Sequence, residues 1–578
     1  MGRQSIAIVA VVAAVSACTS DPEAGFPTAA PAVRDFVSAW NERSEAGMME
    51  TFDSEARAVW EDEDLAAWFE GAMEDGLVED FTVELIGPVD QPSSSEMAND
   101  DVVPTAHVPY AVTYRSEAAS EPVRLDGEIP VVYERSDEAW RVPWRIEHMW
   151  PGIPGGRGFA VTRDYGKRGT LVDRNGRILA RGTGPRRRYP AGSTAGSTIG
   201  HVERLDRREL AEAAEGHVAG DLVGGSGLEQ AFEERLAGRP SMSLFAADLR
   251  GRRLKRLGSS SGGNGRTVRT TLDLRVQRAA AAALGDTVGG AVVMDPHNGD
   301  LLALVSSSEF NPAFYIGVDE LAPFNRALSG LYAPGSSLKV VTAAAALDTK
   351  TMKPSSKVTG PGNYRGVRNF ESGEFGSIDF ATALKFSVNT AFAQVAEKLG
   401  ARRLNRYMEA FGFNREPAMP LAAARSSFPF PEGEADLMWG SIGQAAVVAT
   451  PLQMATVAAT IANRGRRAEP RITMGQQIAM ERVVSPRTAA TMTGLMENVV
   501  EGGTGQRANL GSVGVAGKTG TAELDAAGEM NHAWFICFAP SDDPKVAVAV
   551  VAELGGVGGV VAAPLARGIL QSVLPLVR

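Results

Sequence analysis

One lysine of this chain stands three residues after a serine. The chain has ten lysines, and just one of them completes a Ser-x-x-Lys sequence, Ser336-Ser-Leu-Lys339. Pro334-Gly335 precede it as a helix-start signal, so Ser336 and Lys339 are predicted to share one face of a helix. A serine hydroxyl becomes nucleophilic when a base takes its proton, and a lysine is such a base once burial or nearby positive charge lowers its pKa. The pair therefore predicts a nucleophile, Ser336, with Lys339 as general base.

A second positive charge lies in Gly517-Lys-Thr-Gly520, within the predicted strand 513–523. The two glycines leave the strand edge without side chains, so that a substrate backbone can lie against it. The lysine there is the neighbour expected to lower the pKa of Lys339. A cation and hydroxyl donors on this strand would bind a substrate carboxylate. Lys518, Thr519 and Thr521 are expected in this role, and Gly520 is expected to belong to the same substrate-binding strand.

Between these two sequences lies the one Ser-x-Asn of the chain, Ser387-Val-Asn389, in a predicted helix 386–399. Its hydroxyl could relay a proton, and its carboxamide could hold a substrate amide. Each of the three patterns alone is weak, because a lone Ser-x-x-Lys is usually a helix surface pair and a lone Lys-Thr-Gly is usually a turn. Occurring once each, in this order, on helix, helix and strand, they predict one catalytic pocket.

Taken together, the three patterns resemble the signature of penicillin-binding proteins and serine β-lactamases. Longer stretches narrow the resemblance to the monofunctional (class B) penicillin-binding proteins. These stretches are Arg168–Gly176, Gly225–Glu229, Ala333–Lys339, Thr450–Ala455, Gly502–Gly505 and Lys518–Glu523. The family usually has Gly-Gln-Gly before the Thr450 helix, whereas this chain has Gly443-Gln-Ala445. A different rate or β-lactam affinity is the expected consequence of this departure.

The resemblance implies acyl transfer at a D-Ala-D-Ala stem peptide. Ser336 would attack the penultimate carbonyl with Lys339 as base, and the backbone N–H groups of Ser336 and Thr521 would form the oxyanion hole. Ser387 would pass a proton to the leaving amine, Asn389 would orient the peptide, and an amine of a second strand would resolve the acyl-enzyme. The expected partners are peptidoglycan stem peptides, β-lactams and a glycan-polymerising partner in the membrane. No cofactor is expected.

Hydrophobic periodicity predicts the elements that position these residues. Apolar strands are expected at 289–294, 301–306, 513–523, 533–539 and 545–553, and helices at 337–347, 386–399, 451–463 and 563–574. Strands at both ends with helices between them predict an antiparallel sheet flanked by a helical lobe, with a cleft at their interface. The resemblance makes this region, 268–578, an α/β transpeptidase domain of serine β-lactamase type with a five-stranded sheet.

Charge divides the remaining chain into modules. Residues 21–150 carry 30 acidic groups, 8 arginines and no lysine, whereas the whole chain has a net charge of −11. An early helix followed by alternating segments predicts an α+β cone at 28–151, which resembles the nuclear-transport-factor-like domain of methicillin-resistance-type proteins. The resemblance makes the Gly- and Arg-rich segment 152–267 an elongated pedestal, or dimerisation, domain. Within it, Gly258–Gly265 is expected to be a flexible tip or linker and Arg186–Arg188 a solvated loop.

The N-terminus has the pattern of an export signal. The apolar run Ile6–Val15 is too short to span a membrane and fits a secretory h-region. Val15-Ser-Ala-Cys18 matches a lipobox, so residues 1–18 are expected to be a lipoprotein signal, with lipid on Cys18 and a tether at 19–27. The protein would then be anchored to the outer face of the cell membrane. An ordinary signal peptide cleaved elsewhere, or an uncleaved anchor, is the alternative.

Composition excludes several classes of protein. With 44% hydrophobic residues and 22% charged residues the chain is globular. Two cysteines exclude a disulfide framework, and Cys537, in an apolar run, is expected to be buried. Six scattered histidines predict no metal site, and the basic residues lack the pattern of a nucleic-acid interface. A D,D-carboxypeptidase, a serine β-lactamase and a non-enzymatic cell-wall scaffold stay open as alternatives to a transpeptidase.

Overall fold

The computed structural model describes residues 26–577, apart from 61, 207–216, 218, 308, 317–323 and 524–530. The expected signal sequence, Cys18 and most of the tether lie outside these residues. No helix in the described part of the chain is long and apolar enough to cross a membrane. The chain forms two compact units: residues 1–166 with 239–263, and residues 167–238 with 264–578. The expected pedestal segment, 152–267, thus contributes to both units.

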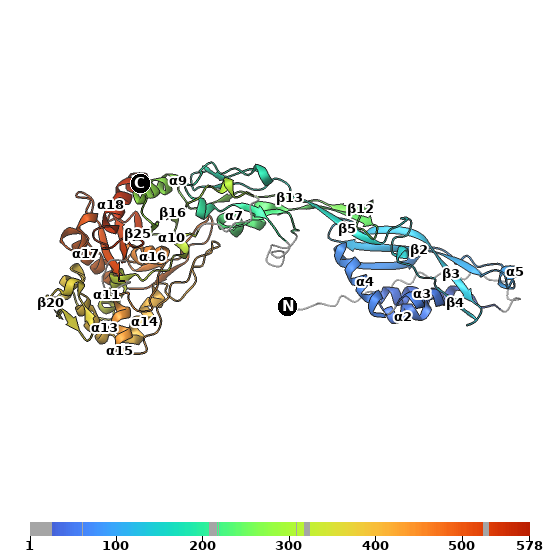
Figure 1. The fold of residues 1–578 in the computed structure, drawn as a ribbon, viewed down its shortest axis with the longest axis horizontal. Coiled ribbons are helices and arrows are strands. Elements are labelled where there is room, and N and C mark those ends of the chain that lie inside the picture. Colours follow the sequence, from blue (N-terminus) through green and yellow to red (C-terminus); the bar gives the residue numbers. More distant parts are fainter. Residues whose placement is uncertain are drawn as a thin grey trace. The chain divides into compact units, whose positions relative to one another are not determined.

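The first unit packs helices against a four-stranded antiparallel sheet of order β1-β2-β3-β4. Its helices are α1 (Ala30–Asn41), α2 (Glu45–Thr51), α3 (Ser54–Val59), α4 (Asp62–Asp75) and α5 (Ser94–Met97). Its strands are β1 (Val78–Leu85), β2 (Thr105–Ser116), β3 (Val123–Glu134) and β4 (Ala139–Arg141). Helix α1 buries Phe36 and Trp40 in a cluster of aromatic rings that includes Phe52 and Trp144. The helix and the alternating strands expected from the sequence are present (Figure 1).

A second sheet extends this unit, with the order β12-β11-β5. Its strands are β5 (Gly158–Asp164), β11 (Ser241–Ala247) and β12 (Arg253–Ser260). Phe159 and Leu244 belong to the same hydrophobic core as the α+β part of the unit. The expectation of a flexible tip at Gly258–Gly265 is wrong for most of these residues, because they are paired as strands. Gly258–Ser260 pair with Met242–Leu244, and β13 (Gly263–Asn264) pairs with β10 (Gly238–Arg239). The small side chains of Gly258–Ser260 are typical of a linker, but backbone pairing to β11 holds these residues in a strand.

The second unit begins with short elements around a buried ion-pair cluster. They are β6 (Leu171–Val172), β7 (Ile178–Ala180), η2 (Gly184–Arg186), α6 (Gly196–Ile199), β8 (Val202–Arg204), β9 (Leu222–Gly224), α7 (Gly227–Ala231), α8 (Glu233–Ala237) and β14 (Val268–Arg269). Arg187 is 2% exposed and pairs with Glu229 at 2.7 Å. Arg168 pairs with Glu229 at 2.9 Å and with Glu233 at 2.6 Å. Arg187 therefore does not belong to a solvated loop as expected, because two buried carboxylates hold both arginines inside.

A five-stranded antiparallel sheet, β16-β15-β25-β24-β23, forms the centre of the second unit and confirms the predicted sheet. Its strands are β15 (Gly289–Met294), β16 (Leu301–Ser306), β23 (Ala516–Ala522), β24 (His532–Ala539) and β25 (Val546–Ala552). Strands β15 and β16 come from the N-terminal part of this region, whereas β23, β24 and β25 come from its C-terminal part. The sheet is buried almost throughout, which explains its continuous apolar runs. Cys537 on β24 is fully buried, as expected.

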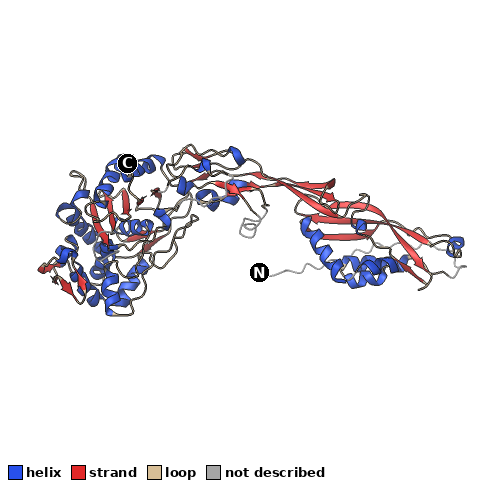
Figure 2. Ribbon diagram, viewed as in Figure 1, coloured by secondary structure: helices blue, strands red, loops and turns tan. Residues whose placement is uncertain are grey.

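Helices cover both faces of this sheet (Figure 2). Helix α16 (Pro451–Ala462) packs on one face, whereas α9 (Leu274–Leu284) and α18 (Ala562–Val573) pack on the other. The helical lobe contains α11 (Lys339–Asp348), α12 (Phe380–Lys385), α13 (Asn389–Leu399), α14 (Ala401–Ala410), α15 (Glu434–Ser441) and α17 (Pro486–Gly502). Small two-stranded sheets, including β17 (Lys357–Gly360) with β20 (Gly376–Asp379), complete it. Strand β23 is an edge of the central sheet and faces the lobe.

Candidate active site

Ser336 lies in a tight 3₁₀ turn, Gly335–Leu338, that leads directly into α11. Ser336 and Lys339 thus lie three residues apart, with Ser336 in the 3₁₀ turn and Lys339 at the first position of α11, rather than both within one regular α-helix. Gly335 has φ +52°, and a Cβ there would lie 2.3 Å from the carbonyl oxygen of Thr521 on β23. Only glycine allows the turn to approach this strand so closely. The position of Ser336 is therefore fixed by the edge of the sheet.

Ser387 does not lie inside a helix as predicted. It has φ +59°, and α13 begins only at Asn389. The left-handed backbone turns both the carbonyl oxygen and the hydroxyl of Ser387 toward Lys339. Hydrophobic periodicity does not predict where the helix begins here, because it depends on the apolar residues of the helix and gives no sign of the one left-handed residue before them. A non-glycine residue in this conformation is a known feature of functional sites.

Lys339 and Lys518 meet at Ser387. Lys339 Nζ donates to the Ser387 carbonyl oxygen at 2.7 Å, to Ser387 Oγ at 3.2 Å and to Asn389 Oδ1 at 2.5 Å. Lys518 Nζ donates to Ser387 Oγ at 2.9 Å and to the carbonyl oxygen of Thr519 at 2.9 Å. Both lysines are fully buried. The three sequence motifs, predicted from different elements, are therefore brought into one hydrogen-bonded group.

Burial changes the protonation of both lysines. It is the larger cause that lowers the pKa of Lys339 well below 10.5, and the positive charge of Lys518 lowers it further, while Glu523 opposes the shift. Burial also lowers the pKa of Lys518 to about 7. An amine with such a pKa is available in its neutral form near neutral pH, where it accepts a proton. The group can therefore act as a base.

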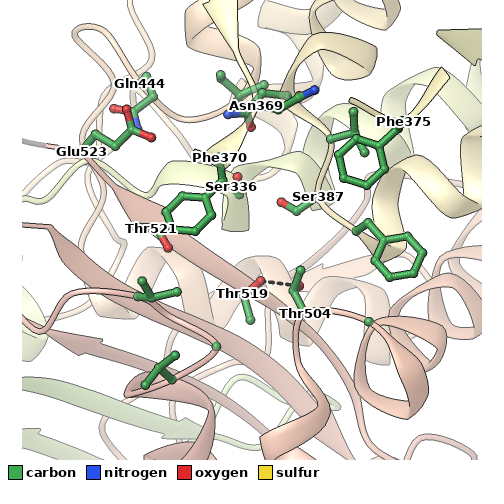
Figure 3. A pocket seen from close by; sticks show the side chains of 18 of the residues that line it. Ser336, Asn369, Phe370, Phe375, Ser387, Gln444, Thr504, Thr519, Thr521 and Glu523 are labelled. Carbon is green, nitrogen blue, oxygen red and sulfur yellow. Dashed lines mark hydrogen bonds between the residues drawn. The ribbon is translucent and has the colours of Figure 1, made fainter. Parts of the chain in front are cut away.

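The site opens into a pocket of about 490 Å³ between the helical lobe and the edge of the sheet. Ser336, Ser387, Asn389, Thr519 and Thr521 line it, with the two lysines behind them. Figure 3 shows Ser336 and Ser387 projecting into the pocket from one side and Thr519 and Thr521 from the other. Ser336 Oγ makes no hydrogen bond with any described residue, so this oxygen is free to meet a substrate.

A row of hydroxyl groups begins on β23 and extends to Thr504 in a neighbouring loop. Thr519 Oγ1 lies 2.7 Å from Thr504 Oγ1, and both side chains line the pocket (Figure 3). Thr521 Oγ1 accepts from the backbone N–H of Gly558 at 3.3 Å. Gly520 contributes no side chain, and a Cβ there would lie 2.7 Å from the Pro334 carbonyl oxygen and 3.0 Å from the Ser337 backbone nitrogen. The sequence did not predict a role for Thr504, although Thr504 lies in Gly502–Gly505, one of the stretches that resemble the family.

Aromatic side chains form a wall of the pocket that sequence analysis missed. Phe370, Phe375 and Phe386 all line it, and the rings of Phe375 and Phe386 stack with centroids 6.3 Å apart. Phe370 is 52% exposed, and its ring projects into the pocket in Figure 3. These residues stand outside any regular helix face or strand alternation. Their sole sequence signal is that large apolar residues occur in loops near the Ser387 motif.

A network of amides holds the segment that carries Phe370. Asn389 Nδ2 donates to the Arg368 carbonyl oxygen at 2.8 Å, while Asn389 Oδ1 accepts from Lys339. Asn369 donates to the carbonyl oxygens of Pro361 and Gly373 and accepts from the Thr390 backbone N–H at 3.0 Å. Asn389 therefore links the buried lysine to the wall of the pocket.

The sequence Gly443-Gln-Ala445, where the family usually has Gly-Gln-Gly, lies beside the turn Gly335–Leu338 that carries Ser336. The Gly335 backbone N–H donates to the Gly443 carbonyl oxygen at 2.9 Å, and Gln444 lines the pocket. Ala445 has φ +59°, a conformation that favours glycine, and its side chain is exposed. The backbone of this loop thus keeps a glycine-type conformation although alanine occupies the position.

Two family models match the chain between residues 181 and 571. Residues 289–571 match the penicillin binding protein transpeptidase domain, and residues 181–270 match the penicillin-binding protein dimerisation domain. The first match contains every catalytic residue expected from the sequence, from Ser336 to Lys518. The second contains the buried Arg187–Glu229 pair.

Relatives with these domains are similar over most of their length. Peptidoglycan D,D-transpeptidase PbpA of Mycolicibacterium smegmatis is 35% identical over 398 residues, which cover 60% of this chain and 79% of that protein. The crystal structure of PBPA from Mycobacterium tuberculosis is 30% identical with a TM-score of 0.58, over 71% of this chain and 98% of that one. Its imipenem acyl-enzyme complex matches with the same identity, TM-score and coverage. The chain belongs to the family of penicillin-binding protein transpeptidases.

Proposed function

We propose that this protein is a peptidoglycan D,D-transpeptidase that cross-links stem peptides through an acyl-enzyme on Ser336. The observation that carries the proposal is the arrangement of two buried lysines around Ser387 Oγ beside an unpaired serine hydroxyl in an open pocket. The relatives with this domain include a peptidoglycan D,D-transpeptidase and a protein acylated by imipenem. β-Lactams are accordingly expected to acylate Ser336.

Acylation begins with proton transfer from Ser336 Oγ to neutral Lys339 Nζ as the oxygen attacks the penultimate carbonyl of D-Ala-D-Ala. The lowered pKa of Lys339 supports its role as general base. Backbone N–H groups of Ser336 and Thr521 are proposed to stabilise the oxyanion, at about 3–4 kcal/mol for such a donor. The close approach of the Gly335 turn to Thr521 supports this assignment.

Collapse of the tetrahedral intermediate needs a proton on the leaving amine. Ser387 Oγ, in contact with both lysines, is placed to pass that proton from Lys339 to the nitrogen of the terminal D-Ala. The amine of a second strand then attacks the ester and gives its proton to Lys339 by the reverse route. The ester bond breaks, Ser336 Oγ leaves and takes the proton from Lys339, and the amide cross-link forms. Asn389 is proposed to orient the peptide.

The terminal carboxylate of the substrate is proposed to bind at β23. Thr519 and Thr521 present hydroxyls to the pocket, and Lys518 lies behind them. Gly520 has no side chain to hold the turn Gly335–Leu338 away from this strand. An extended peptide could pair with the backbone of β23, because β23 is an edge of the sheet. The extension of the hydroxyl row to Thr504 adds a donor that sequence analysis did not assign.

The first unit is proposed to be a nuclear-transport-factor-like domain of the methicillin-resistance type, spanning 28–151. Its helices packed on a four-stranded antiparallel sheet support this reading. We propose further that residues 1–18 are a lipoprotein signal, that lipid on Cys18 anchors the protein outside the cell membrane, and that 19–27 are a tether. Residues 152–267 and 268–578 would be the pedestal and transpeptidase domains, with a glycan-polymerising membrane protein as partner.

Labelling with a fluorescent penicillin tests the nucleophile. Wild type should become covalently labelled, and Ser336→Ala should not. Ser337→Ala is the matched control, since the neighbouring hydroxyl is buried and donates to the Pro334 carbonyl oxygen, away from the pocket; it should label as wild type does. Equal labelling of wild type and Ser336→Ala would overturn the assignment.

Two further measurements separate the alternatives. A long-lived acyl-enzyme supports a penicillin target, whereas rapid hydrolysis supports a β-lactamase. With a D-Ala-D-Ala donor and an added amine acceptor, a transpeptidase forms the cross-linked product and a carboxypeptidase forms mainly the hydrolysed one. A chain that neither labels nor turns over the donor would be a non-enzymatic scaffold.

A further inference from the structure

A strongly basic turn and strand lie at an edge of the second sheet of the first unit, far in sequence from Ser336. We define the basic hairpin as residues 249–256, the turn between β11 and β12 with the first half of β12 (Figure 1). Every residue in it is exposed. Its five basic residues are Arg250, Arg252, Arg253, Lys255 and Arg256.

Little of this charge is neutralised within the protein. Asp248 pairs with Arg252 at 3.0 Å, and no other ion pair to the hairpin occurs among the described residues. In the antiparallel register, Arg253, Lys255 and Arg256 lie opposite Ala247, Ala246 and Phe245, which carry no charge. The neighbouring strand β5 places Gly158, Phe159 and Ala160 behind these. The hairpin therefore keeps a concentrated positive charge in a unit whose residues 21–150 are strongly acidic.

Two large apolar side chains accompany the charges. Leu249, at the tip, is 67% exposed, and Leu254, between the basic residues, is 39% exposed. Charges on an edge strand such as β12 guard against pairing with another sheet. That role explains basic residues on β12 but not a leucine left in water at the tip of the turn. Exposed apolar side chains among basic ones are instead typical of segments that bind an anionic membrane surface.

We propose that the basic hairpin docks the first unit onto an anionic lipid bilayer. Arg250, Arg253, Lys255 and Arg256 contact lipid phosphates, and Leu249 enters the boundary between headgroups and acyl chains. A bilayer is favoured over a soluble polyanion, because a polyanion would engage the charges and leave Leu249 in water. This docking is independent of the chemistry at Ser336 and of lipid on Cys18.

Vesicle co-sedimentation tests the proposal. The chain from Phe26 onward retains every described residue and lacks the expected lipid anchor, so its binding reports protein contacts alone. It should bind phosphatidylglycerol vesicles, bind phosphatidylcholine vesicles far less, and lose affinity as salt is added. Since each basic residue near an anionic surface contributes about fivefold in affinity, R250Q/R253Q/R256Q should weaken binding roughly 100-fold.

A control variant removes the same charge elsewhere in the unit. Arg34, Arg115 and Arg145 are exposed arginines outside the hairpin, so R34Q/R115Q/R145Q should bind as wild type does. Equal losses from both triple variants would show that binding follows net charge and would overturn the proposal. Penicillin labelling of each variant checks that the second unit is folded, and circular dichroism checks the first.

Insertion of Leu249 separates lipid from polyanion. In the chain from Phe26, Leu249→Cys supplies the one exposed thiol, since Cys537 is fully buried. An environment-sensitive dye on it should shift to the blue with phosphatidylglycerol vesicles and not with inorganic polyphosphate. Leu249→Ser should weaken vesicle binding and leave polyphosphate binding unchanged. A dye that stays in water on vesicles, with equal affinity for polyphosphate, would make the hairpin a polyanion site and overturn the membrane proposal.

Discussion

The amines of Lys339 and Lys518 contact a single hydroxyl, that of Ser387, at 3.2 Å and 2.9 Å. Two ammonium groups sharing one acceptor would repel each other in a buried site, so the pair is most stable with one lysine neutral. Burial is the larger cause of the lowered pKa of Lys339, and the charge of Lys518 lowers this pKa further. The proposed base of the reaction is thus prepared in part by a residue on the opposite side of the cleft, 179 positions further along the chain.

Replacing Lys339 by methionine should slow acylation by a factor of about 10²–10⁴, the usual contribution of a positioned general base. Methionine keeps the apolar stem but has no group to take the Ser336 proton. Stopped-flow or gel measurement of fluorescent penicillin labelling would give the rate. Lys398→Met, an exposed lysine on α13, is the matched control and should label at the wild-type rate. Unchanged acylation in Lys339→Met would exclude this lysine as the base.

The acylation rate should also rise with pH. Lys339 must be neutral to act, and its pKa lies well below 10.5, so the rise should be complete well before an ordinary lysine titrates. Rate constants for labelling measured across the neutral and alkaline range would locate the midpoint. A midpoint near 10.5 would mean that the buried site does not perturb the base.

Protein stability should depend on pH through Lys518. Its pKa is about 7 in the folded chain against 10.5 for an ordinary lysine. Between these values the unfolded chain binds more protons, so the unfolding free energy rises with pH by up to about 1.4 kcal/mol per unit. Below pH 7 both states are protonated and the contribution is constant.

Lys518→Met removes this titration. Its stability relative to wild type should therefore increase as pH falls from 10.5 to about 7 and then stay constant. Denaturant unfolding at a series of pH values gives the difference, and Lys398→Met should show none. A difference between Lys518→Met and wild type that does not change with pH would contradict the buried, neutral lysine.

Ala445→Gly should stabilise the fold by about 1 kcal/mol. Alanine is strained at the left-handed φ of this position, whereas glycine adopts such a φ without strain. The side chain is exposed, so little packing is lost. The neighbouring exposed Ala446, which is not left-handed, is the control, and Ala446→Gly should be neutral or destabilising. Chemical denaturation measures both. A loss of stability in Ala445→Gly would show that the loop is held by contacts of the methyl group.

Glu229→Gln should destabilise the protein by about 3–5 kcal/mol, since it leaves Arg168 and Arg187 buried with one carboxylate fewer. Glu434→Gln, in an exposed pair with Arg365, should change stability by less than about 1 kcal/mol. Thermal or denaturant unfolding compares the two. Equal effects would mean that the buried cluster is held by packing rather than by charge.

Much of the second unit could be predicted from sequence because its elements have strong hydrophobic patterns. The predicted strand 513–523 is observed as Ala516–Ala522, and the predicted helix 451–463 as Pro451–Ala462. Long buried strands and apolar helices leave a clear signal in one sequence. Lys518 and Thr519 lie on the strand that the sequence predicts, whereas Ser387 lies before its predicted helix rather than inside it. The structure brings residues of all three motifs together at one pocket.

What sequence could not provide depends on tertiary contacts. The left-handed Ser387 is stabilised by its contacts with Lys339, 48 residues away, and no local pattern marks it. Arg187 resembles a surface residue until Glu229 is placed beside it. The composition of Gly258–Ser260 is typical of a linker. These residues pair with β11 through backbone groups, which every residue type has, so their side chains give no sign of the strand.

The central sheet ends at β23, whose outer backbone edge faces the pocket. An incoming peptide that aligns there would complete the sheet as a temporary sixth strand. Main-chain pairing of this kind does not distinguish one amino acid from another. Selection among stem peptides would then fall to the two ends of the pocket, the threonine hydroxyls and the phenylalanine wall, so changes in ligand preference should arise there while the strand itself stays the same.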